Sequence, residues 1–303
     1  MVGGRASTQA RLGLLVSMAA LEISPPDLNG LVDAWLAEDI GRGDVTTNSV
    51  VPPALEGRAR IEAREPCVVA GMTAASLCFE LTSDRFERAL EFKEVVGDGG
   101  RVDTSDVVAR IEGPLAPILT AERTALNLLA RLCGVATLTR TYVDAVDGTG
   151  ARIVDTRKTT PGLRSLQKYA VVVGGGSNHR FGLDDGILIK DNHLAAAGGV
   201  PEALKRARVN APHGLRIEVE VTTIQELDQA LEGGAEAILL DNMTPDTVAE
   251  AVRITAGRAL LEVSGGINLA TVRSYAMTGV DLISVGALTH SAPSIDLALE
   301  LEE

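Results

Sequence analysis

Short apolar runs recur along the second half of the chain, and segments with helical periodicity separate them. The last four runs start about 20 residues apart, which is the length of one strand and helix unit. This spacing predicts a parallel β-sheet, and we expect the sheet to form an α/β barrel. The six runs cover residues 152–156, 186–190, 217–221, 237–241, 260–264 and 282–286.

Start and end signals bound the helices predicted between the last runs. Thr223 with Glu226 has the pattern of a capping box, and Thr244 precedes a proline, which is favoured in the first turn of a helix. Glycines follow each predicted helix, as they do where helices end. The three start and end pairs are Thr223 with Gly233, Thr244 with Gly257, and Asn268 with Gly279.

The first 130 residues show a different mixture of elements around a glycine-rich turn at 40–44. Predicted helices cover 28–38, 73–81 and 120–146, and predicted strands cover 57–65, 89–96 and 107–114. We therefore expect an N-terminal domain of helices and strands over residues 25–130 and a barrel domain over 131–290. We expect the C-terminal tail, 291–303, to pack with the first domain.

The segment before residue 25 contains an apolar stretch, 12–23, that follows Arg5 and Arg11. This stretch is short for a secretory signal and has no convincing cleavage site. We expect residues 1–24 to form a disordered extension, or translation to begin at Met18.

The overall charge of the chain excludes several partners. The formal net charge is −13 for 303 residues, and only 3% of residues are aromatic. Nucleic acids and anionic membranes attract basic surfaces, and single strands also need aromatic platforms, so we expect neither partner. Three scattered cysteines, Cys67, Cys78 and Cys133, form no CxxC motif, which favours buried thiols in a reducing compartment such as the cytoplasm.

Positive charge gathers in one segment, residues 155–194, against this acidic background. In parallel barrels the reactive groups lie at the C-terminal ends of the strands. The predicted strands here all end in polar, ionisable or glycine residues, which a purely structural barrel would rarely show. These ends are 155–158, 190–192, Glu220, 241–242, 264–266 and Gly286.

Glycines follow the last two predicted strands and indicate a phosphate site. Ser264, Gly265 and Gly266 follow one strand, and Gly286 follows the next. Glycines let backbone N–H groups approach a phosphate, and the N-terminus of a following helix favours negative charge. Two ordinary strand-to-helix turns are the alternative.

Two carboxylates at neighbouring strand ends, Glu220 and Asp241, provide the oxygen ligands that Mg²⁺ prefers. Alternatively they form ion pairs with Lys158 or Lys190. We do not expect zinc, because no His or Cys cluster has the spacing of zinc ligands.

Several cations near the predicted strand ends indicate a ligand with carboxylates. A guanidinium group matches a carboxylate with two parallel hydrogen bonds, which favours Arg157 and Arg180 for this task, with Lys190 beside them. The glycines at 174–176 allow a loop to bring His179 and Arg180 over the barrel mouth. Solvated surface charges are the alternative.

Nine motifs in the same order give the chain a specific likeness to a known family. They are EDIGRGDVTT (38–47), ERTALNLLARLCGVAT (122–137), DTRKTTPGLR, GGGSNHR, LIKDNH, EVEV, LLDNM, SGGIN and SVGALTHS (284–291). On these motifs, which span most of the sequence, the chain resembles quinolinate phosphoribosyltransferase, also called decarboxylating nicotinate-nucleotide pyrophosphorylase.

The resemblance implies an N-terminal α/β sandwich domain, an incomplete α/β (TIM-like) barrel, a Mg²⁺ cofactor and a homodimer or higher oligomer. It implies decarboxylating transfer of a phosphoribosyl group from phosphoribosyl pyrophosphate to quinolinate in NAD biosynthesis. The implied quinolinate residues are Arg157, His179, Arg180 and Lys190, with Arg123 from the partner subunit. The implied phosphoribosyl pyrophosphate residues are Lys158, Glu220, Asp241, Ser264, Gly265, Gly266, Gly286 and His290. Among these, Lys158, Lys190, Glu220 and Asp241 are the expected catalytic residues, and Glu220 and Asp241 the Mg²⁺ ligands.

Three other functions are compatible with parts of the pattern. A related phosphoribosyltransferase would use nicotinate, or belong to the molybdenum-locus paralogues, and would release no CO2. An aldolase-like barrel would form a Schiff base on Lys190. A phosphoribosyl or carboxylate sensor would bind these ligands without turnover.

Overall fold

Two units of secondary structure account for the residues that the structure describes, 25–302 of the computed structural model. The first unit holds residues up to Ala136, then Ser165–Val173 and the residues from Pro293 onward. The second unit holds Thr137–Arg164 and Gly174–Ala292. The predicted extension over 1–24, and the alternative start at Met18, lie outside the described residues.

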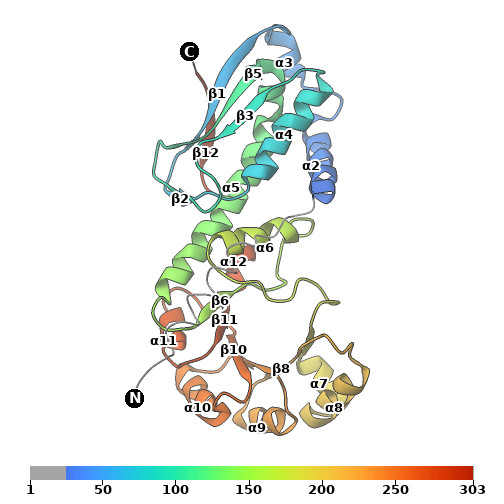
Figure 1. Ribbon diagram of the computed structural model, residues 1–303, viewed down its shortest axis with the longest axis vertical. Helices are drawn as coiled ribbons and strands as arrows, with labels where there is room; N and C mark the ends of the chain where they lie inside the picture. The colour runs from blue at the N-terminus through green and yellow to red at the C-terminus, as the bar shows by residue number, and fades with distance from the viewer. Residues whose placement is uncertain (1–24, 303) are drawn as a thin grey trace, which may run out of the picture. The chain divides into compact units, whose positions relative to one another are not determined.

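An antiparallel sheet of four strands forms the centre of the first unit (Figure 1). Its order is β12 (Leu297–Glu302), β1 (Glu56–Ala63), β5 (Val107–Pro114) and β3 (Glu91–Glu94). The strand positions predicted from the sequence match β1, β3 and β5. The C-terminal segment supplies the remaining strand, because β12 pairs with β1 from Arg58↔Glu302 to Ala63↔Leu297. A separate two-stranded ladder joins β2 (Cys67–Val68) to β4 (Arg101–Val102).

Helices in the first unit are α2 (Pro25–Ile40), α3 (Val45–Val50), α4 (Met72–Arg85), the part of α5 (Leu115–Ala145) up to Ala136, and α6 (Arg164–Val173) from Ser165 onward. The predicted helices match α2, α4 and α5, but α3 and α6 were not expected. Asp44 starts α3, since its carboxylate accepts the backbone N–H of Thr47 at 2.9 Å. The Tyr169 hydroxyl on α6 donates to the Asp98 carboxylate at 2.6 Å, which ties α6 to the first unit.

Six parallel strands form the sheet of the second unit. They are β6 (Arg152–Val154), β7 (Ile187–Ile189), β8 (Ile217–Val221), β9 (Ala237–Asp241), β10 (Leu260–Ser264) and β11 (Leu282–Ser284). Their order in space is β6-β11-β10-β9-β8-β7, so the barrel is open between β6 and β7. The predicted strands and the expected incomplete α/β barrel are confirmed.

A short segment around Ser177 follows the edge of β6 that β11 does not occupy. Ser177 donates its backbone N–H to the Ile153 carbonyl at 2.9 Å, and its own carbonyl accepts the N–H of Asp155 at 3.1 Å. Val154 and Ser177 form an isolated parallel bridge. The residues after the glycine loop are therefore fixed to the open side of the barrel.

Helices follow the strands of the second unit, and capping signals in the sequence predicted three of them. They are α7 (Asp191–Ala197), α8 (Val200–Asn210), α9 (Ile224–Glu232), α10 (Pro245–Thr255), α11 (Val272–Ala276) and α12 (Ala287–His290). The Thr223 and Thr244 hydroxyls cap α9 and α10. Asn268 makes the predicted capping contacts, because its carboxamide oxygen accepts from Ala270 N–H and its carbonyl from Val272 N–H at 2.8 Å, but α11 itself begins only after Thr271.

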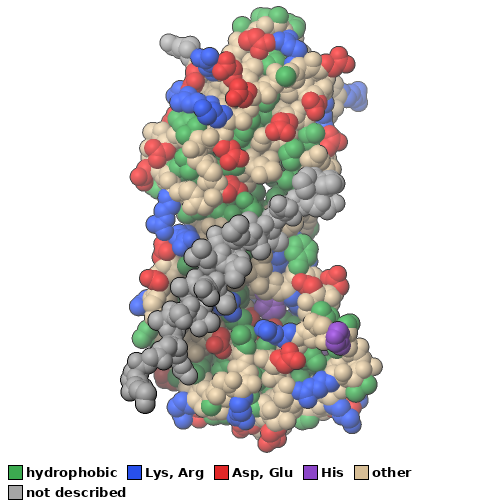
Figure 2. All heavy atoms as spheres, in the orientation of Figure 1, with side chains coloured by type: hydrophobic (Ala, Val, Ile, Leu, Met, Phe, Trp, Pro, Cys, Tyr) green, Lys and Arg blue, Asp and Glu red, His purple; other side chains and the backbone are tan. Residues whose placement is uncertain are grey.

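Charged side chains of both signs are interspersed over the face of the molecule shown in Figure 2. Within residues 25–302, no helix is long and apolar enough to cross a membrane. The three cysteines are buried free thiols.

Candidate active site

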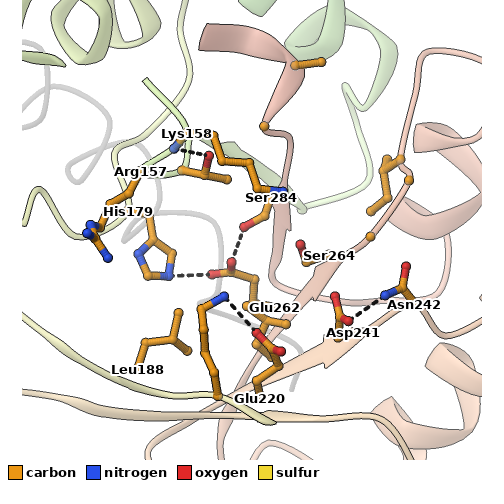
Figure 3. A pocket seen from close by; sticks show the side chains of 18 of the residues that line it. Arg157, Lys158, His179, Leu188, Glu220, Asp241, Asn242, Glu262, Ser264 and Ser284 are labelled. Carbon is orange, nitrogen blue, oxygen red and sulfur yellow. Dashed lines mark hydrogen bonds and ion pairs between the residues drawn. The ribbon is translucent and has the colours of Figure 1, made fainter. Parts of the chain in front are cut away.

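A cavity of about 810 Å³ opens at the C-terminal ends of the barrel strands (Figure 3). Each of the six strands contributes lining residues at or directly after its C-terminal end. Its lining includes every residue predicted for the site except Arg123: Arg157, Lys158, His179, Arg180, Lys190, Glu220, Asp241, Ser264, Gly265, Gly266, Gly286 and His290. Arg123 lies on α5 in the first unit, where its side chain is 63% exposed and 3.7 Å from Glu122.

Two guanidinium groups line the cavity near its β6 end. The Nε atom of Arg157 is buried and has no hydrogen-bond partner among the described residues. The Nη1 atom of Arg180 donates to the Gly186 carbonyl at 3.0 Å. Burial, followed by the charge of Arg157, lowers the pKa of Arg180. A buried donor without a partner and a second cation nearby favour an anionic ligand here, because a carboxylate would satisfy the donor and offset the repulsion.

Lys190 and Glu220 form an ion pair at 3.1 Å across β7 and β8. The Lys190 side chain is 48% exposed and that of Glu220 only 12%. The sequence left Lys158 and Lys190 as possible ion-pair partners of the two carboxylates. Lys190 is the one that pairs with Glu220. A half-exposed ammonium group can exchange this partner for a ligand at small cost.

The loop after β10 brings backbone close to the end of β9. A Cβ atom on Gly265 would lie 2.3 Å from the Asn242 carboxamide oxygen, so a side chain cannot be added without a shift. Gly265 and Gly266 both have positive φ, and so does Asn242. Glycine is therefore required at this approach, as expected where backbone amides face an anion.

The structure corrects one part of the predicted phosphate site, the expectation that the N-terminus of a following helix would contribute to it. Helix α11 begins at Val272, after the turn that contains Asn268, and α12 after Gly286 has four residues. Neither supplies a helix N-terminus of useful length at the glycines. The loop amides and the nearby Lys158, whose Cδ would lie 3.2 Å from a Cβ on Gly286, are the groups available for a phosphate.

Glu220 and Asp241 line the same cavity from adjacent strands, β8 and β9. One Asp241 oxygen accepts from the Asn242 carboxamide at 2.6 Å, and one Glu220 oxygen is held by Lys190. Both groups are hard oxygen donors that face an open cavity. This donor set fits Mg²⁺, which binds through one or two carboxylates together with water and substrate phosphates.

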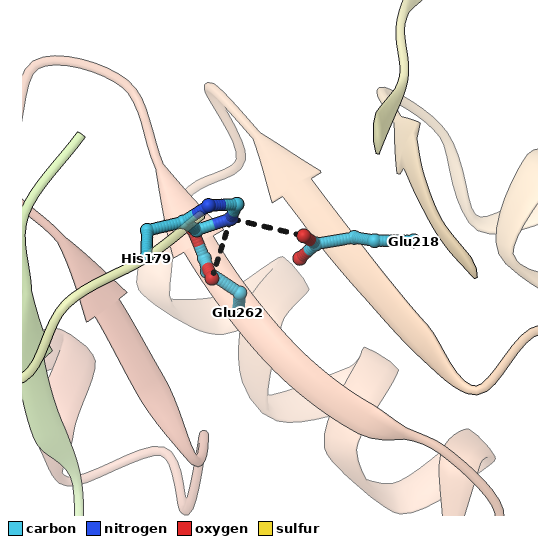
Figure 4. A group of neighbouring side chains, drawn as sticks. All are labelled: His179, Glu218 and Glu262. Carbon is cyan, nitrogen blue, oxygen red and sulfur yellow. Dashed lines mark hydrogen bonds and ion pairs between the residues drawn. The ribbon is translucent and has the colours of Figure 1, made fainter. Parts of the chain in front are cut away.

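His179 forms a cluster in the barrel with two carboxylates, Glu218 and Glu262, that the sequence patterns did not predict (Figure 4). The Nε2 atom of His179 is 3.0 Å from a carboxylate oxygen of Glu218 on β8 and 3.6 Å from one of Glu262 on β10. Burial, and then the charge of Glu218, raise the pKa of Glu262 to about 7. A signal was available, since Glu218 and Glu262 each lie two residues before a predicted site residue and so face the same side of the strand.

Comparisons with known proteins agree on one family. The family model described as quinolinate phosphoribosyl transferase, N-terminal domain matches residues 44–133, and the C-terminal domain model matches 135–300. The chain is 43% identical over 274 residues to the probable nicotinate-nucleotide pyrophosphorylase (carboxylating) of Bacillus subtilis, which covers 90% of this chain and 93% of that protein.

Two further relatives give the same result. The nicotinate-nucleotide pyrophosphorylase (carboxylating) of Mycobacterium leprae is 46% identical over 270 residues, covering 88% of this chain and 94% of the relative. The solved structure of the nicotinate-nucleotide pyrophosphorylase from Francisella tularensis superposes with a TM-score of 0.88 at 36% identity. That superposition covers 93% of this chain and 99% of the other.

Proposed function

The chain belongs to the quinolinate phosphoribosyltransferase family, and from this premise we propose that it transfers the phosphoribosyl group of phosphoribosyl pyrophosphate to quinolinate. The products are nicotinate mononucleotide, pyrophosphate and CO2. Some relatives are named carboxylating pyrophosphorylases and others decarboxylating phosphoribosyltransferases, and both names fit this reaction, because its reverse consumes pyrophosphate and CO2. The enzyme is therefore a decarboxylating phosphoribosyltransferase of pyridine nucleotide biosynthesis.

The observation that supports this function best is the division of one cavity into two kinds of anion site. Arg157 and Arg180 supply guanidinium groups to its lining, and the glycines after β10 and β11 supply backbone to the same lining, with Lys158 beside Gly286. A pyridine dicarboxylate suits the paired guanidinium groups, whereas phosphates suit loop amides and Lys158. A single cavity lined by both kinds of group can hold the two substrates side by side.

Orientation is the first task of these residues. Arg157, Arg180 and Lys190, with His179 beside them, would hold the carboxylates so that the ring nitrogen faces the anomeric carbon of the ribose. The nitrogen lone pair then forms the new C–N bond as the bond from the anomeric carbon to pyrophosphate breaks. The electron pair of that bond leaves with pyrophosphate, whose charge Lys158 and the loop amides would stabilise.

Glu220 and Asp241 would stabilise the positive charge that develops on the ribose in the transition state. Glycosylation leaves a cationic pyridinium ring. When the carboxylate next to the ring nitrogen leaves as CO2, its bonding electron pair stays on the ring carbon beside that cation, and the carbon then takes a proton from water. The ring itself is the electron sink, so this step needs no further cofactor.

We propose Mg²⁺ as the cofactor, held by Glu220 and Asp241 together with the substrate. When bound, the ion would neutralise charge on the pyrophosphate. Ser264, Gly265, Gly266, Gly286 and His290 would contact phosphoribosyl pyrophosphate.

We also propose a homodimer in which Arg123 completes the quinolinate site of the partner subunit. Support comes from the exposure of its side chain and from its position in the first unit, whereas every lining residue of the cavity belongs to the second. The three free thiols support a cytoplasmic location.

One assay tests the function. The protein is incubated with Mg²⁺, phosphoribosyl pyrophosphate and either quinolinate or nicotinate, and CO2 and nicotinate mononucleotide are measured. We expect both products from quinolinate and neither from nicotinate, with loss of activity in excess EDTA. Mononucleotide formed from nicotinate without CO2 would favour the monocarboxylate alternative.

A further inference from the structure

Both ring nitrogens of His179 are engaged within the protein. Nδ1 accepts the backbone N–H of Arg180 at 2.7 Å, and Nε2 faces the carboxylates of Glu218 and Glu262. A backbone N–H can only donate, so Nδ1 carries no proton, and the proton of the neutral ring is on Nε2. The Nε2–H group then donates to the carboxylate of Glu218, and the carboxylate of Glu262 lies 3.6 Å from the same nitrogen.

The cluster of His179, Glu218 and Glu262 also has the residue types that bind metal ions. The Nε2 atom and one oxygen of each carboxylate lie within 4.8 Å of one another. A metal ion on Nε2 would displace its proton, and Nδ1 already accepts a hydrogen bond. The ring would then be an imidazolate, which is far less accessible than neutral imidazole, so a hydrogen bond fits the geometry better.

Both carboxylates are buried, and a further hydrogen bond from a neighbouring strand holds Glu262. Glu218 and Glu262 are 8% and 1% exposed, and the Ser284 hydroxyl on β11 donates to Glu262. Three strands of the barrel, β8, β10 and β11, therefore hold the position of the His179 ring (Figures 3 and 4).

The backbone of His179 is held from the opposite side of the opening. Its N–H donates to the buried carboxylate of Asp155 at 2.9 Å, directly after β6. His179 thus connects the open edge at β6 to β8 and β10. Arg180, the next residue, projects into the cavity from this connection and receives a second restraint through its backbone N–H.

We propose that Glu218 and Glu262 are positioning residues, which hold the His179 ring so that its Nδ1 fixes the backbone of Arg180 for the carboxylate of the substrate. In this role the His179 ring links Glu218 and Glu262 to the backbone of Arg180. The inference rests on the proposed function, because quinolinate is the ligand whose binding it explains.

Two substitutions at Glu218 separate positioning from simple electrostatics. Glu218→Ala removes the acceptor for Nε2–H, whereas Glu218→Gln keeps an acceptor oxygen without the charge. We expect Glu218→Ala to raise the KM for quinolinate about tenfold and Glu218→Gln less than about threefold, with the KM for phosphoribosyl pyrophosphate within about twofold of wild type. If the carboxylate acted only by repelling a dianion, both variants would lower the KM for quinolinate, and this result would overturn the proposal.

A double-mutant cycle tests whether the effect passes through Arg180. In an Arg180→Ala background we expect Glu218→Ala to change the KM for quinolinate by less than about twofold, because the group that it positions is gone. A full tenfold effect in that background would overturn the proposal.

If circular dichroism shows that Glu218→Ala is unfolded, His179→Asn replaces it in the kinetic test. The asparagine oxygen still accepts from Arg180 N–H, but nothing reaches the carboxylates, so the KM for quinolinate should again rise, and an unchanged value would count against the inference. Wild-type turnover of quinolinate is measured first. Its absence would overturn the proposed function and the inference together, whereas normal turnover with unchanged KM in the variants would overturn the inference alone.

Discussion

The ammonium group of Lys190 lies 3.1 Å from the carboxylate of Glu220, so a proposed quinolinate residue and a proposed Mg²⁺ ligand are paired with one another. The two substrates would each take one partner of this pair. Binding of quinolinate and of Mg²⁺ with phosphoribosyl pyrophosphate would thus both begin by separating a half-exposed ion pair, which contributes little to stability.

Glu220→Gln tests this separation of roles. We expect kcat to fall by about 10² because the developing positive charge on the ribose loses a carboxylate. The free energy of unfolding should change by less than about 1 kcal/mol, since Lys190 is half exposed. Steady-state kinetics and urea unfolding measure the two quantities, and Glu202→Gln on α8 is the control. A large loss of stability with little loss of kcat would assign Glu220 a structural role instead.

Truncation of either cavity guanidinium should impair quinolinate binding. We expect Arg157→Ala and Arg180→Ala each to cost about 2 to 5 kcal/mol in kcat/KM for quinolinate, because a desolvated carboxylate is left unpaired. Arg206→Ala removes an exposed cation from α8 and is the control for charge alone. Activity within threefold of wild type for Arg157→Ala or Arg180→Ala would contradict their assignment.

Mixing experiments test the proposed action of Arg123 on the partner subunit. Chains with Arg123→Ala are mixed with chains that carry Arg157→Ala, and dimers are allowed to exchange. Half of random dimers are mixed and one of their two sites is intact, so activity should recover to roughly a quarter of wild type. Two samples of Arg157→Ala chains mixed together are the control. Mixed dimers proven by mass spectrometry that stay inactive would exclude action in trans.

The loop glycines offer a matched pair of substitutions. Gly265→Ala introduces a Cβ 2.3 Å from the Asn242 oxygen, whereas Gly266→Ala meets no atom within 4 Å, and both positions have positive φ. Both variants therefore carry backbone strain of about 1 to 2 kcal/mol, but only Gly265→Ala displaces the loop. We expect a clear rise in the KM for phosphoribosyl pyrophosphate with Gly265→Ala and a smaller one with Gly266→Ala. Equal effects would show that strain alone matters.

Sequence patterns predicted the barrel strands well, because apolar runs spaced by one strand and helix unit are typical of parallel α/β sheets. The cavity residues followed, since parallel strands bring their C-terminal ends to one place. Glu218 and Glu262 were not predicted because they lie two residues before the C-terminal positions that the barrel rule indicates, although residues two positions apart on a strand share a face. The place of α6 was not predictable, since its own sequence does not say which unit its apolar side chains join. Arg123 was indicated only by the family resemblance.

Glu262 should make the stability of the protein depend on pH. Its pKa in the folded chain is raised from 4.5 to about 7 by burial and by Glu218, with Asp155 adding to the shift and His179 and Ser284 opposing it. Between these pH values the folded chain holds a proton that the unfolded chain releases, so the contribution of Glu262 to stability is lost as pH rises through this window.

Glu262→Gln removes that loss, because the amide is neutral at every pH. We expect the variant to be more stable than wild type by about 1 to 3 kcal/mol at pH 8, and by much less at pH 5. Thermal unfolding at both pH values measures the difference, with Glu250→Gln on the exposed face of α10 as the control. A difference between variant and wild type that is the same at pH 5 and pH 8 would mean that Glu262 keeps an ordinary pKa in the folded protein.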